Sequence, residues 1–341
     1  MAKASDTVTF SAPNGGDIKF TAMGFGSACI GNYRRALTEE ESDATLEAAW
    51  DSGLRYFDTA PFYGFTLAET RLGRLLACRP RDSFTLSTKV GRIMDPCSPD
   101  ETDQSLYVGA ADFIPRFDYS YAGVMRSYEE SLARIGVDRV DILYVHDIDA
   151  LVHGGRDAAV ARTHQLFDEG GWRALSELRS SGDVRALGIG VNEWQPCALM
   201  LELADPDLFL LAGRYTLIET EPLTTLFPEC EKRGVGIIIG GPYNSGILAG
   251  GDTYNYGDVP ADIAETVSHL RSLCHRHQVT LPGAALQFVL AHPAVTSAIP
   301  GPMSAEEVLS NVSYMDEPIP AEFWADLKDA GVIPGNAPVP A

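Results

Sequence analysis

The feature that most constrains the fold is a strict alternation between short apolar segments and longer segments of helical period. Strands that are apolar on both faces are typical of a parallel sheet covered by helices. The strand-like segments number eight and span residues 20–25, 54–58, 84–89, 140–146, 186–191, 208–212, 236–240 and 296–300. This pattern therefore predicts an α/β protein with a parallel sheet.

The segments between these strands have the period of amphipathic helices. They span residues 38–52, 67–76, 123–135, 172–181, 196–204, 223–233, 281–291 and 304–314. The first begins with Thr38 followed by Glu39, Glu40 and Glu41, which is a capping box with acids in the first helical turn. Eight strand–helix units predict a (β/α)8 TIM barrel with long loops on its C-terminal face, and a doubly wound open sheet is the alternative.

Length and composition agree with one large globular domain. A barrel of this kind takes about 250 residues. The 341-residue chain is therefore expected to form a single barrel domain over residues 1–341, with a core at about 20–314 and a C-terminal tail at 315–341. The surplus is expected in an N-terminal extension and in insertions at 93–119, 150–171 and 250–278.

The charge and the cysteines exclude several classes of function. Lys+Arg 26 against Asp+Glu 47 gives a net charge of −21, which disfavours nucleic acid and anionic membranes as partners. The six cysteines form no Cys-x-x-Cys pair and are interpreted as reduced thiols. The N-terminus has no apolar signal segment, so a cytoplasmic protein acting on a small molecule is expected, without a prediction of its oligomeric state.

Several familiar motifs are missing from the sequence. The best match to G-x-G-x-x-G is GFGSAC at 24–29, where Cys29 replaces the third glycine. No glycine precedes a lysine, which excludes a P-loop, and no G-x-S-x-G elbow is present. His269, His275 and His277 share one helical segment, but His275 and His277 point to different faces, so no metal site is predicted.

Four polar residues are predicted to meet at one end of the barrel. Lys89 ends the strand at 84–89, and barrels keep their active sites at the carboxyl ends of strands. A buried ammonium needs an acidic partner, and Asp58 ends the preceding strand. Tyr63 follows in the turn PFYG at 61–64, and His146 ends the next strand.

This grouping has a chemical logic. A tyrosine hydroxyl has a pKa of about 10, and a lysine ammonium at roughly 4 Å would favour the phenolate by ~4 kcal/mol before burial opposes it. Asp58 is expected to keep Lys89 charged, and Tyr63 is then expected to exchange a proton near neutral pH. His146 is expected to orient the reacting oxygen through a hydrogen bond.

Three other interpretations of the same residues remain. In the first, each residue has only a structural role, because a lone Asp or Tyr in such a loop is more often a cap or a packing residue. Lys89 as the nucleophile of a Schiff-base lyase would need a depressed pKa, which a paired Asp58 opposes. A barrel that binds a nucleotide without catalysis is the third reading, and an intact set of four disfavours it.

These residues resemble those of the aldo-keto reductase superfamily. The D-x-x-x-x-Y-G pattern is met by Asp58, Tyr63 and Gly64, followed by Lys89 and His146, and the resemblance runs over residues 20–314. It implies a (β/α)8 barrel that transfers hydride between a nicotinamide cofactor and a carbonyl or alcohol. It also implies that the catalytic residues are Asp58, Tyr63, Lys89 and His146, with Tyr63 exchanging the proton.

The resemblance also implies where the cofactor binds. Within GVNEW at 190–194, Asn192 is the expected donor to the nicotinamide carboxamide, and the role of Glu193 is left open. The segment GGPYNSGIL at 240–248 is expected to contact the ring and the pyrophosphate through Gly241, Pro242, Tyr243, Asn244, Gly246 and Leu248. The last strand and its helix are expected to contribute Gly301, Glu307 and Asn311.

The last of these segments favours NAD over NADP. Family members that prefer NADP tend to place a lysine and an arginine where this chain has Gly301 and Glu307. A carboxylate near a 2′-phosphate should cost about 1–2 kcal/mol, or roughly tenfold in affinity. NAD is therefore the expected cofactor.

One branch of the family is especially similar in RFDYSYAGVMRS at 116–127 and DILYVHDID at 141–149. That branch contains D-threo-aldose 1-dehydrogenases, also called L-fucose dehydrogenases, and pyridoxal 4-dehydrogenases, which oxidise a cyclic hemiacetal to a lactone with NAD. The resemblance implies an aldose substrate, with pyridoxal as the alternative. The residues expected around the substrate are Phe25, Phe62, Asp147 and Trp194.

Overall fold

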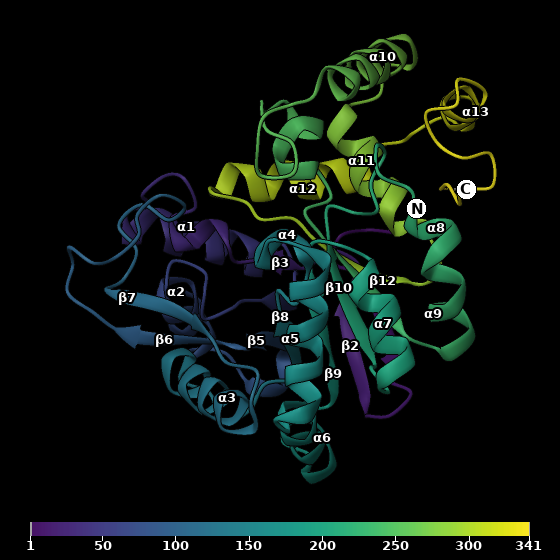
Figure 1. The fold of residues 1–341 in the computed structure, drawn as a ribbon. Coiled ribbons are helices and arrows are strands. Elements are labelled where there is room, and N and C mark those ends of the chain that lie inside the picture. The colour runs from purple at the N-terminus through teal and green to yellow at the C-terminus, as the bar shows by residue number, and fades with distance from the viewer. Residues whose placement is uncertain (1, 341) are drawn as a thin grey trace.

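The computed structural model describes residues 2–340, and its centre is a barrel of parallel strands (Figure 1). Neighbouring strands follow the chain order, and Met23 pairs with Ala298 in parallel to close the first strand onto the last. The predicted (β/α)8 barrel is therefore confirmed. Its strands are β3 (Phe25–Gly26), β4 (Tyr56–Asp58), β5 (Thr85–Val90), β8 (Ile142–His146), β9 (Ala186–Val191), β10 (Leu208–Ala212), β11 (Gly236–Gly240) and β12 (Val295–Ile299).

Helices wrap the outside of the barrel and bury their apolar faces against the strands. Thr38 caps α1 as predicted, because its hydroxyl accepts from the Glu41 N–H while the Glu41 carboxylate accepts from the Thr38 N–H at 2.8 Å. Seven of the eight predicted helices are found within a few residues of their expected ends, and the segment predicted as one helix at 223–233 forms two, α8 and α9. They are α1 (Glu39–Asp51), α2 (Leu67–Leu76), α3 (Tyr121–Ile135), α6 (Gly171–Ser181), α7 (Gln195–Leu203), α8 (Pro222–Thr225), α9 (Phe227–Arg233), α11 (Leu281–Leu290) and α12 (Ala305–Asp316).

The first predicted strand, at 20–25, is only partly correct. Phe20 lies in β2 (Asp17–Thr21), which pairs antiparallel with β1 (Thr7–Ser11) instead of joining the barrel. The Phe20 ring is fully buried and meets Tyr56 edge to face, with ring centroids 4.8 Å apart. One apolar run therefore serves two elements, because the open N-terminal end of the barrel needs apolar side chains to close it.

The insertions leave the barrel where the site is expected, after the carboxyl ends of β5, β8 and β11. Residues 93–119 lie largely in a hairpin, residues 150–171 form two helices, and residues 250–278 lead into one long helix. The segment predicted as a tail carries a further helix with Phe323, Trp324 and Leu327 buried. These elements are β6 (Arg92–Pro96), β7 (Phe113–Phe117), α4 (Ala150–His153), α5 (Arg156–Asp168), η3 (Asn244–Ala249), α10 (Ala261–His277) and α13 (Ala321–Asp329), with short turns η1 (Cys29–Gly31) and η2 (Arg81–Ser83).

Within residues 2–340, the helices are too short or too polar to span a lipid bilayer.

Candidate functional site

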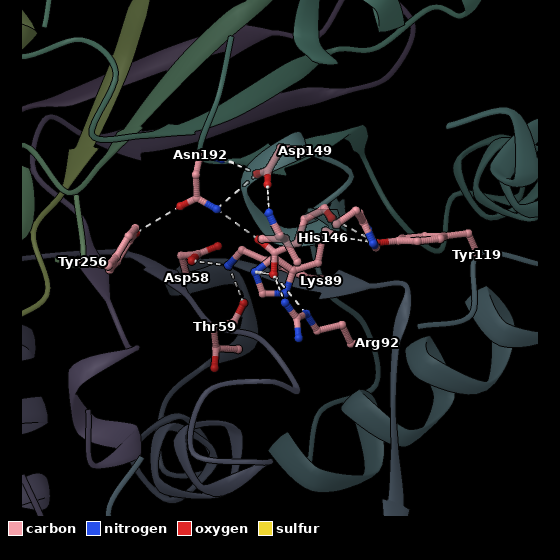
Figure 2. A network of polar contacts seen from close by, with 12 residues as sticks. Asp58, Thr59, Lys89, Arg92, Tyr119, His146, Asp149, Asn192 and Tyr256 are labelled. Atoms are coloured by element: carbon pink, nitrogen blue, oxygen red, sulfur yellow. Dashed lines mark hydrogen bonds and ion pairs between the residues drawn. The ribbon is translucent and has the colours of Figure 1, made fainter. Parts of the chain in front are cut away.

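A buried ion pair joins the ends of two neighbouring strands. The Lys89 ammonium donates to Oδ2 of Asp58 at 2.6 Å and to the carbonyl oxygen of Thr59 at 2.9 Å (Figure 2). Ser87, two residues before Lys89 and therefore on the same face of β5, donates to Oδ1 of Asp58 at 2.7 Å. The two charged side chains are only 1% and 2% exposed. Each carboxylate oxygen thus has a donor, which a buried pair needs to be stable.

Burial and pairing act on Asp58 in opposite directions. Burial raises the pKa of the Asp58 carboxyl, while the Lys89 ammonium and the Ser87 hydroxyl act to lower that pKa. The Lys89 stem fits because Gly190 on β9 has no side chain. A Cβ at Gly190 would lie 3.3 Å from Cε of Lys89.

Tyr63 and His146 lie beside this pair, as the sequence predicts. The Lys89 ammonium is 4.7 Å from the centre of the Tyr63 ring, and the His146 ring meets that ring edge to face at 5.7 Å. The turn that carries Tyr63 depends on Gly64, whose φ is +65° and whose Cβ would approach the Gly31 carbonyl oxygen at 2.3 Å. All four predicted catalytic residues are therefore brought together at one end of the barrel.

The expected effect of Lys89 on Tyr63, a lowered pKa of the hydroxyl, is not found. Burial, followed by the charge of Asp58, raises the pKa of the Tyr63 hydroxyl well above its usual value. Two of the ammonium N–H groups point to Asp58 and Thr59, and the ammonium lies over the ring face. Tyr63 is therefore expected to keep its proton near neutral pH.

His146 is a neutral imidazole. Burial lowers its pKa to about 3; the charge of Asp147 opposes this shift, and the charges of Lys89 and Arg92 add to it. A neutral imidazole donates one hydrogen bond and accepts one. Its Nδ1 atom is buried and has no hydrogen-bond partner among residues 2–340, so one of these two capacities is unused.

A second charged pair, missed in the sequence, lies next to His146. Arg92 donates to Oδ2 of Asp147 through Nε at 3.0 Å and Nη2 at 2.7 Å. Its guanidinium lies 3.7 Å from the ring centre of Phe62 and 4.4 Å from that of Phe117. Arg92 follows Lys89 by three residues, and a cation so soon after a buried strand is the signal that would have identified it.

Asn192 links this pair to the loop after β9. Its amide nitrogen donates to Oδ1 of Asp147 at 3.3 Å and to Oδ2 of Asp149 at 3.2 Å, and its backbone N–H donates to Asp149 at 2.7 Å. Asp149 is fully buried, and burial together with the charge of Asp147 raises its pKa to about 6. The Tyr256 hydroxyl donates to Oδ1 of Asn192 at 3.1 Å (Figure 2).

Glu193, whose role the sequence leaves open, binds the start of α4. Its Oε2 accepts from the backbone N–H groups of Ala150 at 2.6 Å and Leu151 at 3.2 Å. The carboxylate therefore caps the first turn of α4, where helix N–H groups lack partners of their own.

The glycines after β11 suit a phosphate-bearing cofactor. Gly241 and Gly246 have φ values of +54° and +107°. A Cβ at Gly246 would meet only the Gly251 backbone, at 3.9 Å, so the loop surface is open to a ligand at this position. Backbone of this kind lets N–H groups approach a phosphate closely.

Other residues predicted in this loop have protein partners. Asn244 is fully buried, donates to the Gly213 carbonyl oxygen at 2.9 Å and bonds the Thr216 hydroxyl, so its side chain fastens the loop to the neighbouring one. Pro242 is buried, and Leu248 is part of the hydrophobic core. The contribution of these three side chains is to hold the loop in place.

Tyr243 and Asn311 meet each other, because the Tyr243 hydroxyl donates to Oδ1 of Asn311 at 2.7 Å. This contact joins the loop after β11 to α12. The hydrogen bond fixes the two side chains relative to each other, so they are expected to contact the cofactor as one rigid surface.

The start of α12 carries a negative charge where an anion would otherwise bind. The Ser304 hydroxyl accepts from the Glu307 N–H at 3.1 Å, and Oε2 of Glu307 accepts from the Met303 N–H at 2.7 Å. Gly301 lies close by, since its Cβ would be 3.2 Å from Sγ of Cys29. Negative charge of Glu307 also contributes to the raised pKa of Cys29, after burial.

The four residues expected around the substrate occupy different surroundings. Phe62 meets the His146 ring edge to face at 6.3 Å, and Oδ2 of Asp147 lies 3.5 Å from Nε2 of that histidine. Trp194 is partly buried, with an indole N–H that has no partner among residues 2–340. Phe25 is 1% exposed and packs on Phe57, so the structure does not bring it into this group.

Comparison with known proteins agrees with the geometry. A model of the aldo/keto reductase family matches residues 22–331. The chain is 41% identical over 326 residues to a pyridoxal 4-dehydrogenase of Microbacterium luteolum, covering 92% of this chain and 94% of that protein. It is 38% identical over 324 residues to a D-threo-aldose 1-dehydrogenase of a Pseudomonas species, with the same two coverages.

The fold is also similar to that of solved structures. An aldo-keto reductase from Bacillus halodurans, in its holo form, matches with a TM-score of 0.72 and 22% identity. The match covers 95% of this chain and 96% of that one.

The ion pair of Lys89 and Asp58 makes a testable prediction about stability. Lys89→Met leaves a buried carboxylate without its cation and should lower the free energy of unfolding by about 3–5 kcal/mol. Combining Lys89→Met with Asp58→Asn removes both charges and should cost less than the sum of the single losses. Urea unfolding at pH 7 measures all three variants. Lys232→Met, at a side chain 74% exposed, is the control, and strictly additive losses would contradict the pairing.

Proposed function

Because the chain belongs to the aldo/keto reductase family, we propose that it is an NAD-dependent dehydrogenase oxidising the hemiacetal carbon of an aldose to a lactone. The observation that carries this proposal is the meeting of Asp58, Tyr63, Lys89 and His146 at one end of the barrel. The aldose would be of the L-fucose or D-threo type, which the similarity to a D-threo-aldose 1-dehydrogenase supports.

The proposed step is balanced by one proton and one hydride. The hydroxyl on the hemiacetal carbon gives its proton to the Tyr63 phenolate, and the hydrogen on the same carbon leaves as hydride, so that carbon becomes the carbonyl of a lactone. His146, as a neutral imidazole, hydrogen-bonds the reacting oxygen and orients it. When bound, NAD supplies the hydride acceptor, and its positively charged ring favours the phenolate.

Tyr63 needs help to lose its proton, because burial and Asp58 raise its pKa. Lys89 contributes a fixed positive charge at 4.7 Å from the ring centre, and Asp58 in turn holds that ammonium in place. In the direction of reduction the same neutral Tyr63 is a ready proton donor.

The residues proposed to hold the cofactor lie around the same rim. Asn192 would bind the carboxamide as an acceptor through Oδ1 instead of as the predicted donor, because its side-chain N–H groups donate to Asp147 and Asp149. The backbone around Gly241 and Gly246 would take the pyrophosphate. Gly301 and Glu307 would lie near the adenosine ribose, where the Glu307 carboxylate would repel a 2′-phosphate and so favour NAD.

Pyridoxal is the second candidate substrate. It also forms an internal hemiacetal, which the same step converts to a lactone. The similarity to a pyridoxal 4-dehydrogenase supports it, and so does an aromatic cluster beside His146 suited to a pyridine ring. In that cluster Phe62 contacts Tyr107 at 5.6 Å and Phe65 at 5.7 Å between ring centres.

The Schiff-base reading of Lys89 is disfavoured by its contacts. A nucleophilic lysine needs a free lone pair, and here the ammonium donates to Asp58 and Thr59 inside the barrel. Trapping of a substrate adduct with borohydride would be the sign of that chemistry.

The reaction is tested by an activity screen over L-fucose, D-arabinose, L-galactose and pyridoxal with NAD. We expect formation of NADH with at least one of the four, and a loss of about 10²–10⁴-fold in kcat in Tyr63→Phe because the proton acceptor is missing. Absorbance of NADH measures both. A wild-type protein inactive with all four substrates, or a Tyr63→Phe variant of full activity, would contradict the proposal.

The cofactor preference is tested at Glu307. Glu307→Gln keeps a hydrogen-bond acceptor for the Met303 N–H but removes the charge, so affinity for NADP should rise by about tenfold while affinity for NAD changes little. Calorimetric titration of both cofactors gives the ratio of dissociation constants. Glu306→Gln, the exposed neighbour in the same helical turn, is the control and should change the ratio less. Tighter binding of NADP than NAD by the wild type would overturn the preference.

A further inference from the structure

We propose that Asp147 is a positioning residue that holds His146 and Asn192 in one fixed arrangement, with Arg92 as its counter-ion. This inference rests on the proposed function, because it assigns the proton-handling histidine and the carboxamide-binding amide to the same support. It means that His146, beside the reacting oxygen, and Asn192, beside the nicotinamide, keep a constant position relative to each other.

The contacts of the Asp147 carboxylate carry this proposal. Oδ2 accepts two hydrogen bonds from Arg92 and lies 3.5 Å from Nε2 of His146. Oδ1 accepts from the side-chain amide of Asn192 at 3.3 Å. One carboxylate thus lies beside a proposed catalytic residue at one oxygen and accepts a hydrogen bond from a proposed cofactor residue at the other.

Burial makes the counter-ion necessary. Asp147 is 6% exposed, and a carboxylate at such a depth is costly without a cation. Arg92 meets this need in a fixed orientation, because Phe62 and Phe117 lie against its guanidinium. Two N–H groups on one oxygen give the pair directional strength that a single contact would lack.

The backbone of Asp147 is fixed as firmly as its side chain. Its φ of +56° is a left-handed conformation that residues other than glycine seldom adopt. The fully buried Tyr119 places its hydroxyl 2.9 Å from the His146 carbonyl oxygen and 3.2 Å from that of Asp147, so it donates to this pair of carbonyls. On the other side, the Asp147 N–H donates to the Gly190 carbonyl oxygen at 2.9 Å.

Arg92 and Tyr119 come from the two ends of the insertion that follows β5. Arg92 begins β6, and Tyr119 lies two residues after the end of β7. The insertion therefore contacts residues 146–147 twice: Tyr119 binds their backbone carbonyl groups, and Arg92 binds the Asp147 side chain. Arg92 and Tyr119, which would not contact the reactants, would in this way fix the distance between His146 and the side-chain amide of Asn192.

The test compares Asp147→Asn and Arg92→Leu with the wild type, using the substrate identified in the activity screen. We expect kcat to fall at least tenfold and the dissociation constant of NADH to rise several-fold in both variants, because both supported residues are loosened. Arg92→Lys restores the charge without the paired contact and should recover part of kcat. Asp95→Asn breaks an exposed pair with Arg116 on the same hairpin and is the matched control, with kcat and NADH binding unchanged.

Coupling is measured by adding Asn192→Ala to each background. In the wild type this change should lower kcat by about tenfold at saturating NAD, and in Asp147→Asn by less than about threefold, because the link is already broken. Equal losses in both backgrounds, or unchanged kcat in Asp147→Asn, would overturn the inference. Thermal unfolding of every variant identifies those that fail to fold, for which Arg92→Lys provides the milder perturbation.

Failure of the proposed function is distinguishable from failure of this inference. If the wild type oxidises none of the four hemiacetals, the proposed function fails. The same variants are then compared in the reduction of glyceraldehyde by NADH, which uses the same histidine and amide. Additive effects in that assay would overturn the inference by itself.

Discussion

The buried ion pair between Lys89 and Asp58 is the interaction on which the rest of the site depends. A lysine ammonium inside a barrel is stable only with an anion and further acceptors, and Asp58 and Thr59 provide both. That requirement fixes the ends of β4 and β5 relative to each other. It also fixes where positive charge meets the Tyr63 ring, and hence which proton the site can move.

The barrel strands and the loops that follow them contribute different residues to the site. The strands bring Asp58, Lys89 and His146 to one rim, because the carboxyl ends of parallel strands lie on the same side. The loops after the strands add a second charged pair: Arg92 begins the hairpin after β5, and Asp147 begins the loop after β8. Charge is therefore concentrated in two adjacent pairs, with the neutral His146 between them.

Most of the barrel and the four proposed catalytic residues could be predicted from the sequence. A strand that is apolar on both faces and ends in a charged residue fits few structures other than a parallel sheet with a site at its carboxyl end. The split of residues 20–25 was not accessible, since Phe20 is equally apolar as a strand residue or as a plug. Nor were the pairing of Arg92 with Asp147 and the raised pKa of Tyr63. Both depend on distances across loops, and on the balance of burial against charge, which no spacing of residues encodes.

We expect Tyr63 to be a neutral phenol in the free protein, despite Lys89, and to become acidic when the positively charged nicotinamide ring lies beside it. Nuclear magnetic resonance of ¹³C-labelled tyrosine, with Tyr63→Phe to assign the signal, measures this ionisation directly. We expect no ionisation of Tyr63 up to about pH 10 without cofactor and a lower pKa with NAD bound. A Tyr63 that ionises near neutral pH in the free protein, or whose titration NAD does not change, would contradict the account.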